Sequence, residues 1–211
     1  MLNPRRQSGM SLVEMLVSLV AGLVVVASAI SLFTAVIVSG NTTLMLSRLN
    51  QDVQAVTDII ARDIQRAGYD PDAVALVGSS PPSASAYTFS TEKDLWPAPS
   101  TMASCIRVKY RDTEGGTSIG RIYSHITSSR QLRVKDSSVS SALTSTDCGS
   151  GGNQLISSTE VVIDSLNFKL VPGSNPTGVR AVNISISATH ARNPDLSLSL
   201  ERRVRIRNDG Y

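Results

Sequence analysis

One carboxylate in this chain of 211 residues stands where an ionised group is costly, inside a long apolar run near the N-terminus. Glu14 is the only formal charge between Met10 and Val38. Those 29 positions would form a helix of roughly 44 Å, longer than the ~30 Å hydrocarbon core of a bilayer. A charge inside such a segment usually marks a function, because lipid offers it no solvation. Glu14 is therefore the first candidate for a functional residue.

Two cysteines, Cys105 and Cys148, are the next candidates, and both lie far downstream of the apolar run. Arg5 and Arg6 precede the run and predict that its N-terminal end stays in the cytoplasm. The rest of the chain is then outside, where two cysteines most often form a disulfide. A disulfide between them would close a loop of about 43 residues and would stabilise the fold by about 3–4 kcal/mol in the chain-entropy model. The alternative is a pair of free, buried thiols.

The remaining chemistry-bearing residues do not form a catalytic pattern. His125 and His190 are the only histidines, and each falls on a predicted strand, where histidine is usually a solvated or capped face residue. The common nucleophile, zinc, phosphate-loop and C-x-x-C motifs are absent from the sequence. Residues 149–152 are glycine-rich, but no helix is predicted after them to hold a phosphate. We therefore expect no enzyme activity, no cofactor and no metal site.

The net charge of +3 gives little support to nucleic-acid binding. Arg5 and Arg6 account for two of the 20 basic residues, and 17 residues are acidic, so the remainder is almost neutral. Nucleic-acid binders usually carry a concentrated basic face. The nearest candidate here is a short group of arginines at 202, 203, 205 and 207.

The elements around these residues begin with one long helix. Beyond the apolar run, apolar residues recur at three- and four-residue steps: Leu46, Leu49, Val53, Val56, Ile60, Ile64 and Ala67. The opposite face is charged and places Asp58 and Arg62 at a favourable i,i+4 spacing. Gly68, with Pro71 after it, is a stop signal. We predict a nearly continuous helix from Met10 to about Ala67, apolar all round in its first half and amphipathic in its second.

Antiparallel strands are expected after a connector at residues 69–104 that is rich in serine and proline. Alternating apolar residues predict strands at 105–111, 118–126, 131–135, 161–171, 179–190 and 196–208. A change of face near Arg202 suggests a β-bulge. Turns, not helices, join the strands, including one at 172–176, and a loop at 137–152 holds Cys148. The predicted fold class is α+β, with a long N-terminal helix whose apolar stripe packs on an antiparallel β-sheet.

Two ordinary interpretations of the N-terminus fit less well. A secretory signal peptide could be cut after Ala27-Ser28-Ala29, but the apolar run starts too early, carries a charge and continues past that point. A plain signal anchor explains the length and the orientation of the segment. It leaves Glu14 unexplained.

A third interpretation rests on a resemblance. The residues Arg5-Arg6-Gln7-Ser8-Gly9, followed by Met10-Ser11-Leu12-Val13-Glu14, resemble the leader and first helical turns of type IV pilins and type II secretion pseudopilins. The resemblance implies that a prepilin peptidase cleaves between Gly9 and Met10 and methylates the new amine of Met10. Glu14 would then pair with the N-terminal amine of a neighbouring subunit and select one axial register. Two departures are methionine at residue 10, where phenylalanine is commonest, and the lack of a helix proline.

A second segment narrows the resemblance. Residues 63–69, Asp-Ile-Gln-Arg-Ala-Gly-Tyr, are similar to a segment of PilW-type minor pilins and of the related J-type pseudopilins. The implied type IV pilin fold has a leader at 1–9, a transmembrane and polymerisation half of the helix at 10–39 and an amphipathic half at 40–68. A globular β-sheet domain follows at 69–211, with an αβ loop and a loop pinned by the disulfide.

The resemblance also implies a function without enzyme activity. The chain would be a minor pilin that helps to prime pilus assembly and sits at or near the pilus tip, supporting adhesion and twitching motility. Its partners would be prepilin peptidase, other minor pilins, the major pilin and the inner-membrane assembly machinery. It would first be a single-pass inner-membrane protein with a periplasmic C-terminal domain, and later part of the pilus at the cell surface. The alternatives are a J-like minor pseudopilin of a type II secretion system, and a membrane-anchored periplasmic binding module that contacts DNA during uptake.

Overall fold

The structure is a computed structural model that describes residues 9, 11–73, 85–98, 102–113, 115–149, 151–171 and 181–207. The chain divides into two compact units, Met1–Met45 and Leu46–Tyr211, and we describe each by itself. Met10 and the turn expected at 172–176 lie outside the described residues. The α+β class predicted from the sequence is confirmed.

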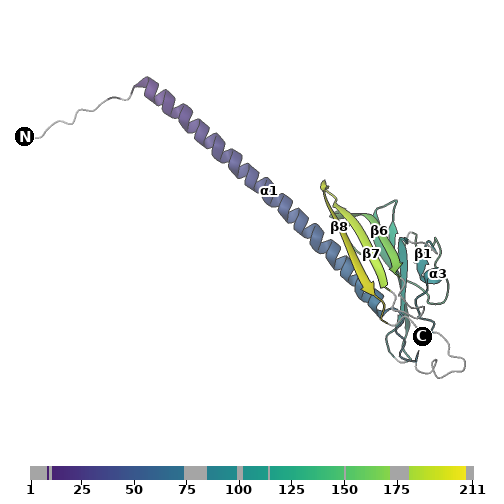
Figure 1. The fold of residues 1–211 in the computed structure, drawn as a ribbon. Coiled ribbons are helices and arrows are strands. Elements are labelled where there is room, and N and C mark those ends of the chain that lie inside the picture. Colours follow the sequence, from purple (N-terminus) through teal and green to yellow (C-terminus); the bar gives the residue numbers. More distant parts are fainter. Residues whose placement is uncertain are drawn as a thin grey trace, which may run out of the picture. The chain divides into compact units, whose positions relative to one another are not determined.

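Helix α1 runs from Leu12 to Arg66, so the predicted long helix is present (Figure 1). Its apolar part is long and hydrophobic enough to cross a membrane, by length and composition, and none of it is buried inside the protein. Within this first unit most of the described hydroxyl groups bond to the helix itself. Ser18, Ser28 and Thr34 each donate to the carbonyl four residues earlier, at 2.7, 2.8 and 2.9 Å. Such bonds satisfy these donors without water, as a lipid environment requires.

In the second unit, α1 buries the stripe that the sequence predicted. Leu49, Val53, Ile60 and Ile64 are almost completely inaccessible to solvent. Leu46, which the periodicity placed on the same stripe, is 43 % exposed because it lies at the first position of this unit. The buried stripe forms the centre of the hydrophobic core.

The end of α1 is set by Gly68, which has a φ of 79°. This left-handed conformation suits glycine and stops the helix as predicted. The Gly68 amide donates to the carbonyl of Lys109 at 2.9 Å, and the Arg111 amide donates to the carbonyl of Tyr69 at 2.9 Å. The segment after the helix is therefore fastened to the next strand.

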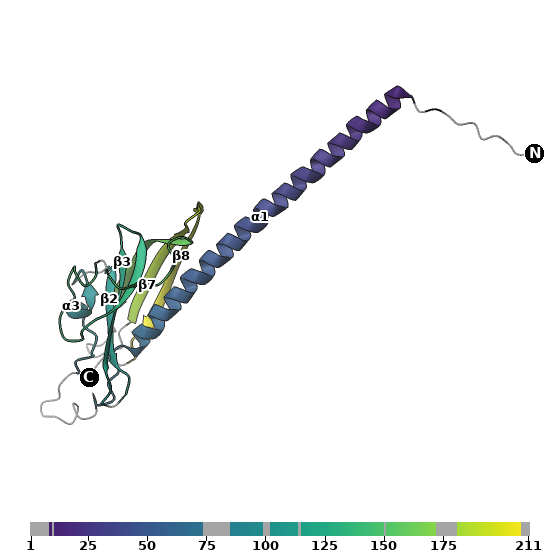
Figure 2. The same ribbon diagram turned by 180° about the vertical axis from the view of Figure 1, so that it is seen from behind.

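The strands are antiparallel, as predicted, but they form two sheets instead of one (Figures 1 and 2). The first sheet has the order β1-β2-β3-β4-β5 and the second β6-β7-β8. The bounds in the first sheet are Leu95–Trp96, Cys105–Arg111, Ser118–Ile126, Gln131–Asp136 and Asn153–Gln154. Those in the second are Val161–Val171, Ala181–His190 and Asn193–Arg205. A short helix, α3 (Thr91–Asp94), and the two-residue strands β1 and β5 were not predicted.

The two sheets are joined by hydrogen bonds at the edge strand β6. Ala103 and Phe168 form an isolated bridge, with N–O distances of 2.9 and 2.7 Å. The ring of His125 contacts the carbonyl of Ile163 at 2.9 Å, and burial lowers the pKa of this histidine. The inner faces of both sheets then cover the α1 stripe together.

The β-bulge expected near Arg202 is wrong. The pairing of β7 with β8 runs without a shift through Ile184 and Arg202, and the irregularity lies at Thr189 and His190. Arg202 therefore stays on the face that carries Leu200 and Val204, where it forms an ion pair with Asp58 of α1. The i,i+4 pair predicted between Asp58 and Arg62 is replaced by this long-range contact.

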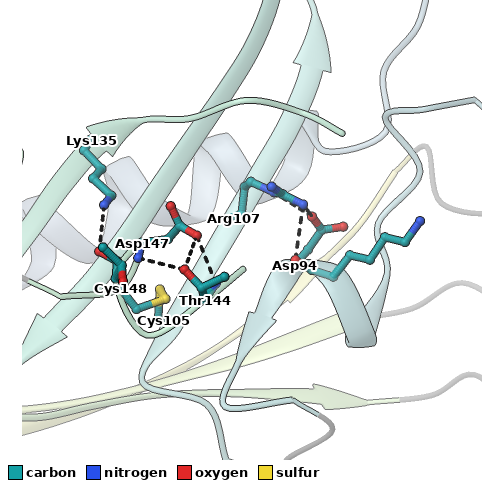
Figure 3. The surroundings of a disulfide bond; sticks show 9 residues. Asp94, Cys105, Arg107, Lys135, Thr144, Asp147 and Cys148 are labelled. Atoms are coloured by element: carbon teal, nitrogen blue, oxygen red, sulfur yellow. Dashed lines mark hydrogen bonds and ion pairs between the residues drawn. A yellow bond between two sulfur atoms is a disulfide. The ribbon is translucent and has the colours of Figure 1, made fainter. Parts of the chain in front are cut away.

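The other face of the first sheet is covered by loops, and the predicted disulfide is present there (Figure 3). Cys105 of β2 is bonded to Cys148, with their Cα atoms 5.8 Å apart. Leu143 and Ile122 pack beside the bond in a small second apolar cluster. The disulfide thus fastens the loop that contains Cys148 to the middle of the sheet.

A buried ion cluster fastens α3 to the same face. Asp94 is fully buried. Its carboxylate accepts a hydrogen bond from Nε of Arg107 at 2.8 Å and forms an ion pair with Nζ of Lys109 at 3.0 Å. Its second oxygen also accepts the Ser90 amide at 2.8 Å. Arg107 donates further to the carbonyls of Lys93 and Ser138, so α3 and the loop after β4 share one guanidinium. Figure 3 shows Asp94 and Arg107 facing each other across this layer.

Candidate functional site

Glu14 lies in the first turn of α1, and its side chain is exposed. Its amide donates to the carbonyl of Ser11 at 3.0 Å, which places the residue at the helix start. The positive end of the helix dipole favours a carboxylate at this position. Among the residues that the structure describes, no donor contacts the Glu14 carboxylate.

The surroundings of Glu14 make that carboxylate unusual. Residues 11–47 contain no other Asp, Glu, Lys or Arg. The hydroxyls of Thr42 and Thr43, like those nearer the N-terminus, donate to carbonyls of the helix, at 3.0 and 2.9 Å. Glu14 is therefore the one ionisable group on an apolar helix whose described hydroxyls mostly bond within the helix. The Glu14 carboxylate can accept hydrogen bonds from a cation, and the described residues supply no such cation.

Gly9 precedes the helix and is exposed. Its φ does not require glycine, and a Cβ built there would meet no atom within 4 Å. The folded chain therefore gives no reason for glycine at this position. A requirement for glycine would have to come from another molecule that handles the chain here. Met10, the predicted site of methylation, is outside the described residues.

A second cluster joins the end of α1 to the first sheet. Asp63 is buried, accepts a short hydrogen bond from the Tyr123 hydroxyl, and forms an ion pair with Arg121 at 3.1 Å. Burial, together with the Asp63 charge, raises the pKa of Tyr123 well above its ordinary value of 10.0. From the sequence alone, Asp63 stands out only as part of the segment at 63–69 that resembles other pilins. Its one local signal is a charge beside the apolar stripe at Ile60 and Ile64.

The C-terminal arginines do not form one basic patch. Arg202 contacts Asp58, whereas Arg203 and Arg205 follow the opposite face of β8 and are exposed. Arg207 lies beyond the end of β8 and lines a pocket with Arg66. The alternation of the strand separates these residues, which weakens the case for a continuous nucleic-acid surface.

The two histidines have structural surroundings. His125 lies at the junction of the sheets, and Nδ1 of the buried His190 accepts the Arg192 amide at 3.2 Å. Within the described part of the chain, no group of three His, Cys, Asp or Glu residues could hold a metal ion.

Two family models match this sequence. The model described as "Prepilin peptidase-dependent protein B" matches residues 42–206, and the one described as "Prokaryotic N-terminal methylation motif" matches residues 4–30. The second match covers Gly9, Met10 and Glu14, and the first covers the globular unit almost completely. No curated protein and no solved structure matches the chain.

Replacing Asp63 by asparagine tests the cluster at the end of α1. We expect the free energy of unfolding at pH 8 to fall by about 1–3 kcal/mol, because the Tyr123 and Arg121 donors lose a charged acceptor. The raised pKa of Tyr123 means that its neutral form stabilises the fold below pH 10 and that this contribution is lost above it. D63N should therefore show a smaller loss of stability between pH 10 and 11.5, and a Tyr123 pKa closer to 10.0 in an absorbance titration.

Asp52→Asn is the matched control, because Asp52 also lies on α1 but has no contact with a described donor. Guanidinium unfolding curves of the full chain in detergent would give the comparison. Equal stability and equal pH dependence for D63N and D52N would contradict the role assigned to Asp63.

Proposed function

The chain belongs to the prepilin peptidase-dependent protein B family, a group of type IV pilin-like structural proteins, and we propose that it acts as a minor pilin of the PilW type. Its N-terminal methylation motif and hydrophobic helix anchor it in the inner membrane before assembly. The proposal adds a position at or near the pilus tip, help in priming pilus assembly, and support of adhesion and twitching motility.

The unpartnered carboxylate of Glu14 is the observation that carries this proposal. A chain that only displayed an outer domain would gain nothing from a carboxylate on an apolar helix, and would lose several kcal/mol by desolvating it. A subunit that packs its helix against other such helices gains a specific contact. The carboxylate can accept hydrogen bonds from the N-terminal ammonium of a neighbour, and two charges that are costly alone then offset each other.

Processing between Gly9 and Met10 would create that ammonium. An uncleaved leader would keep the N-terminal amine upstream of Arg5 and Arg6 in the chain. Cleavage would place a new amine only four residues before Glu14 in the sequence. The lack of any structural need for glycine at residue 9 supports a role in recognition by prepilin peptidase. Methylation of the Met10 amine would keep its positive charge.

The apolar part of α1 also offers a surface for neighbouring helices. Small residues at 35, 39 and 40 line a shallow groove on this face, together with leucines at 32 and 44. Small side chains let helix backbones approach closely in lipid. The other minor pilins, the major pilin and the inner-membrane assembly machinery are the proposed partners of this helix.

Replacing Glu14 by alanine is expected to leave leader cleavage intact and to reduce incorporation into filaments at least about tenfold, since a charge-assisted contact would be lost. The measurement is the amount of this subunit in sheared pili relative to the amount in the inner membrane. Glu92→Gln, an exposed acidic position in α3, is the control. Normal incorporation of E14A would remove the role assigned to Glu14.

Deleting the gene separates the two filament systems. If the chain is a minor pilin, we expect surface pili and twitching to be lost while secretion of exoproteins continues, because assembly would lack a priming subunit. Electron microscopy and a secretion assay on the same strain measure both. Normal piliation with a loss of secreted exoprotein would instead identify a J-like pseudopilin. Normal piliation with a loss of DNA uptake would favour the binding module.

A further inference from the structure

A pocket of about 350 Å³ lies at the C-terminal end of α1, and neither of the two arginines that line it takes part in the ion pairs described above. Its walls come from distant parts of the sequence: Gln65, Arg66, Tyr69, Tyr110, Asp112 and Arg207. This volume is at the small end of ligand-binding sites and suits one or two small rings.

The backbone around the pocket is held in place. Tyr69 follows the left-handed Gly68, donates its amide to the Arg66 carbonyl at 3.1 Å, and accepts the Arg111 amide at 2.9 Å. Tyr110 is buried in β2, so its ring forms a firm wall, whereas the residue Tyr69 is 44 % exposed. The pocket therefore combines a fixed wall with an aromatic ring that is open to a ligand.

Two arginines, Arg66 and Arg207, line this pocket, and neither forms an ion pair with a carboxylate among the described residues. Arg66 lies over the ring of Tyr110 at 5.9 Å and near the negative end of the helix dipole, so it also has a structural role. Arg207 lies over no aromatic ring among the described residues, and its side chain is exposed. By contrast, Arg111 and Arg121 are each paired with aspartate.

A larger pocket beside β3 and β4 has no such unpaired arginine among its described lining residues. It is lined by Arg121, Tyr123 and Lys135, among others. Arg121 and Tyr123 are both bonded to Asp63, and Lys135 donates to the carbonyl of Thr146 at 3.3 Å. Its cations are already used within the fold, so it offers less to an anion.

We propose that the pocket at the end of α1 binds an acidic sugar residue, a carboxylate-bearing unit of a surface glycan. Two guanidiniums can hold one carboxylate through charge-assisted hydrogen bonds. The open Tyr69 ring provides an apolar surface for one face of the sugar. Gln65 and the Asp112 carboxylate can exchange hydrogen bonds with its hydroxyls.

The carboxylate of Asp112 also decides against nucleic acid as the ligand. A phosphodiester chain would bring repeated negative charges beside it, whereas a single sugar presents one charge and several hydroxyls. The inference goes beyond the proposed place in a filament, because it concerns a ligand of the isolated chain. Its failure would leave the role of Glu14 untouched.

Ligand-observed NMR on the full chain in detergent micelles tests the proposal. The probes are N-acetylneuraminic acid, the neutral sugar N-acetylglucosamine and a single-stranded DNA oligonucleotide. The expected result is saturable binding of the acidic sugar alone, weakened about tenfold or more by Arg207→Gln. Arg203→Gln removes the same charge at an exposed position of β8 outside the pocket and should leave binding unchanged.

The other outcomes overturn the proposal. No saturable binding of the acidic sugar, equal binding of the neutral sugar, or equal losses in R207Q and R203Q would exclude an acidic-sugar site here. DNA binding that R207Q abolishes, in the absence of sugar binding, would assign the pocket to nucleic acid instead.

Discussion

The globular unit depends on the covering of one apolar stripe of α1. Leu49, Val53, Ile60 and Ile64 contribute a single row of side chains, and the inner faces of two sheets close over it. Because the chain has few aromatic residues, this aliphatic row supplies much of the core. Three polar contacts hold the sheets in position on the stripe. Asp63 accepts a hydrogen bond from Tyr123 of β3, Asp58 forms an ion pair with Arg202 of β8, and the segment after Gly68 bonds to β2.

The same helix has no such cover upstream. From Leu12 to Leu44 its described side chains are exposed or nearly so, and nearly all of them are apolar or small. Only a medium or partners that are themselves apolar can satisfy this surface, which explains why most of its described hydroxyls bond to the helix backbone. Glu14 is the exception to this rule. An element that otherwise avoids polar exposure therefore points to a charged partner at its first turn.

Local patterns in the sequence predicted the parts of the structure that have local causes. The 3.6-residue periodicity gave the stripe of α1, alternation gave the longer strands, and Gly68 gave the helix end. The disulfide between Cys105 and Cys148 was predictable because Arg5 and Arg6 place both cysteines outside the cytoplasm, where disulfides form. The chain's long-range polar contacts could not be found this way, because Asp58 meets Arg202 across 144 positions instead of its helical neighbour Arg62.

The division into two sheets and the buried cluster at Asp94 have the same explanation. Both depend on which strand edges and loops meet in space, and the residues 90–98 gave no periodic signal. The candidate sites differ in the same way. Gly9 and Glu14 were identifiable from residue type and spacing, whereas the pocket with Arg66 and Arg207 required the fold to bring distant parts of the sequence together.

We propose that Glu14 meets an N-terminal ammonium that processing at Gly9 creates. The decisive measurement is mass spectrometry of the mature protein, purified from the membrane with its prepilin peptidase active. We expect an N-terminal peptide that begins at Met10 and carries one N-methyl group. An intact leader, or a chain that begins at Ile30 after cleavage by signal peptidase, would contradict it.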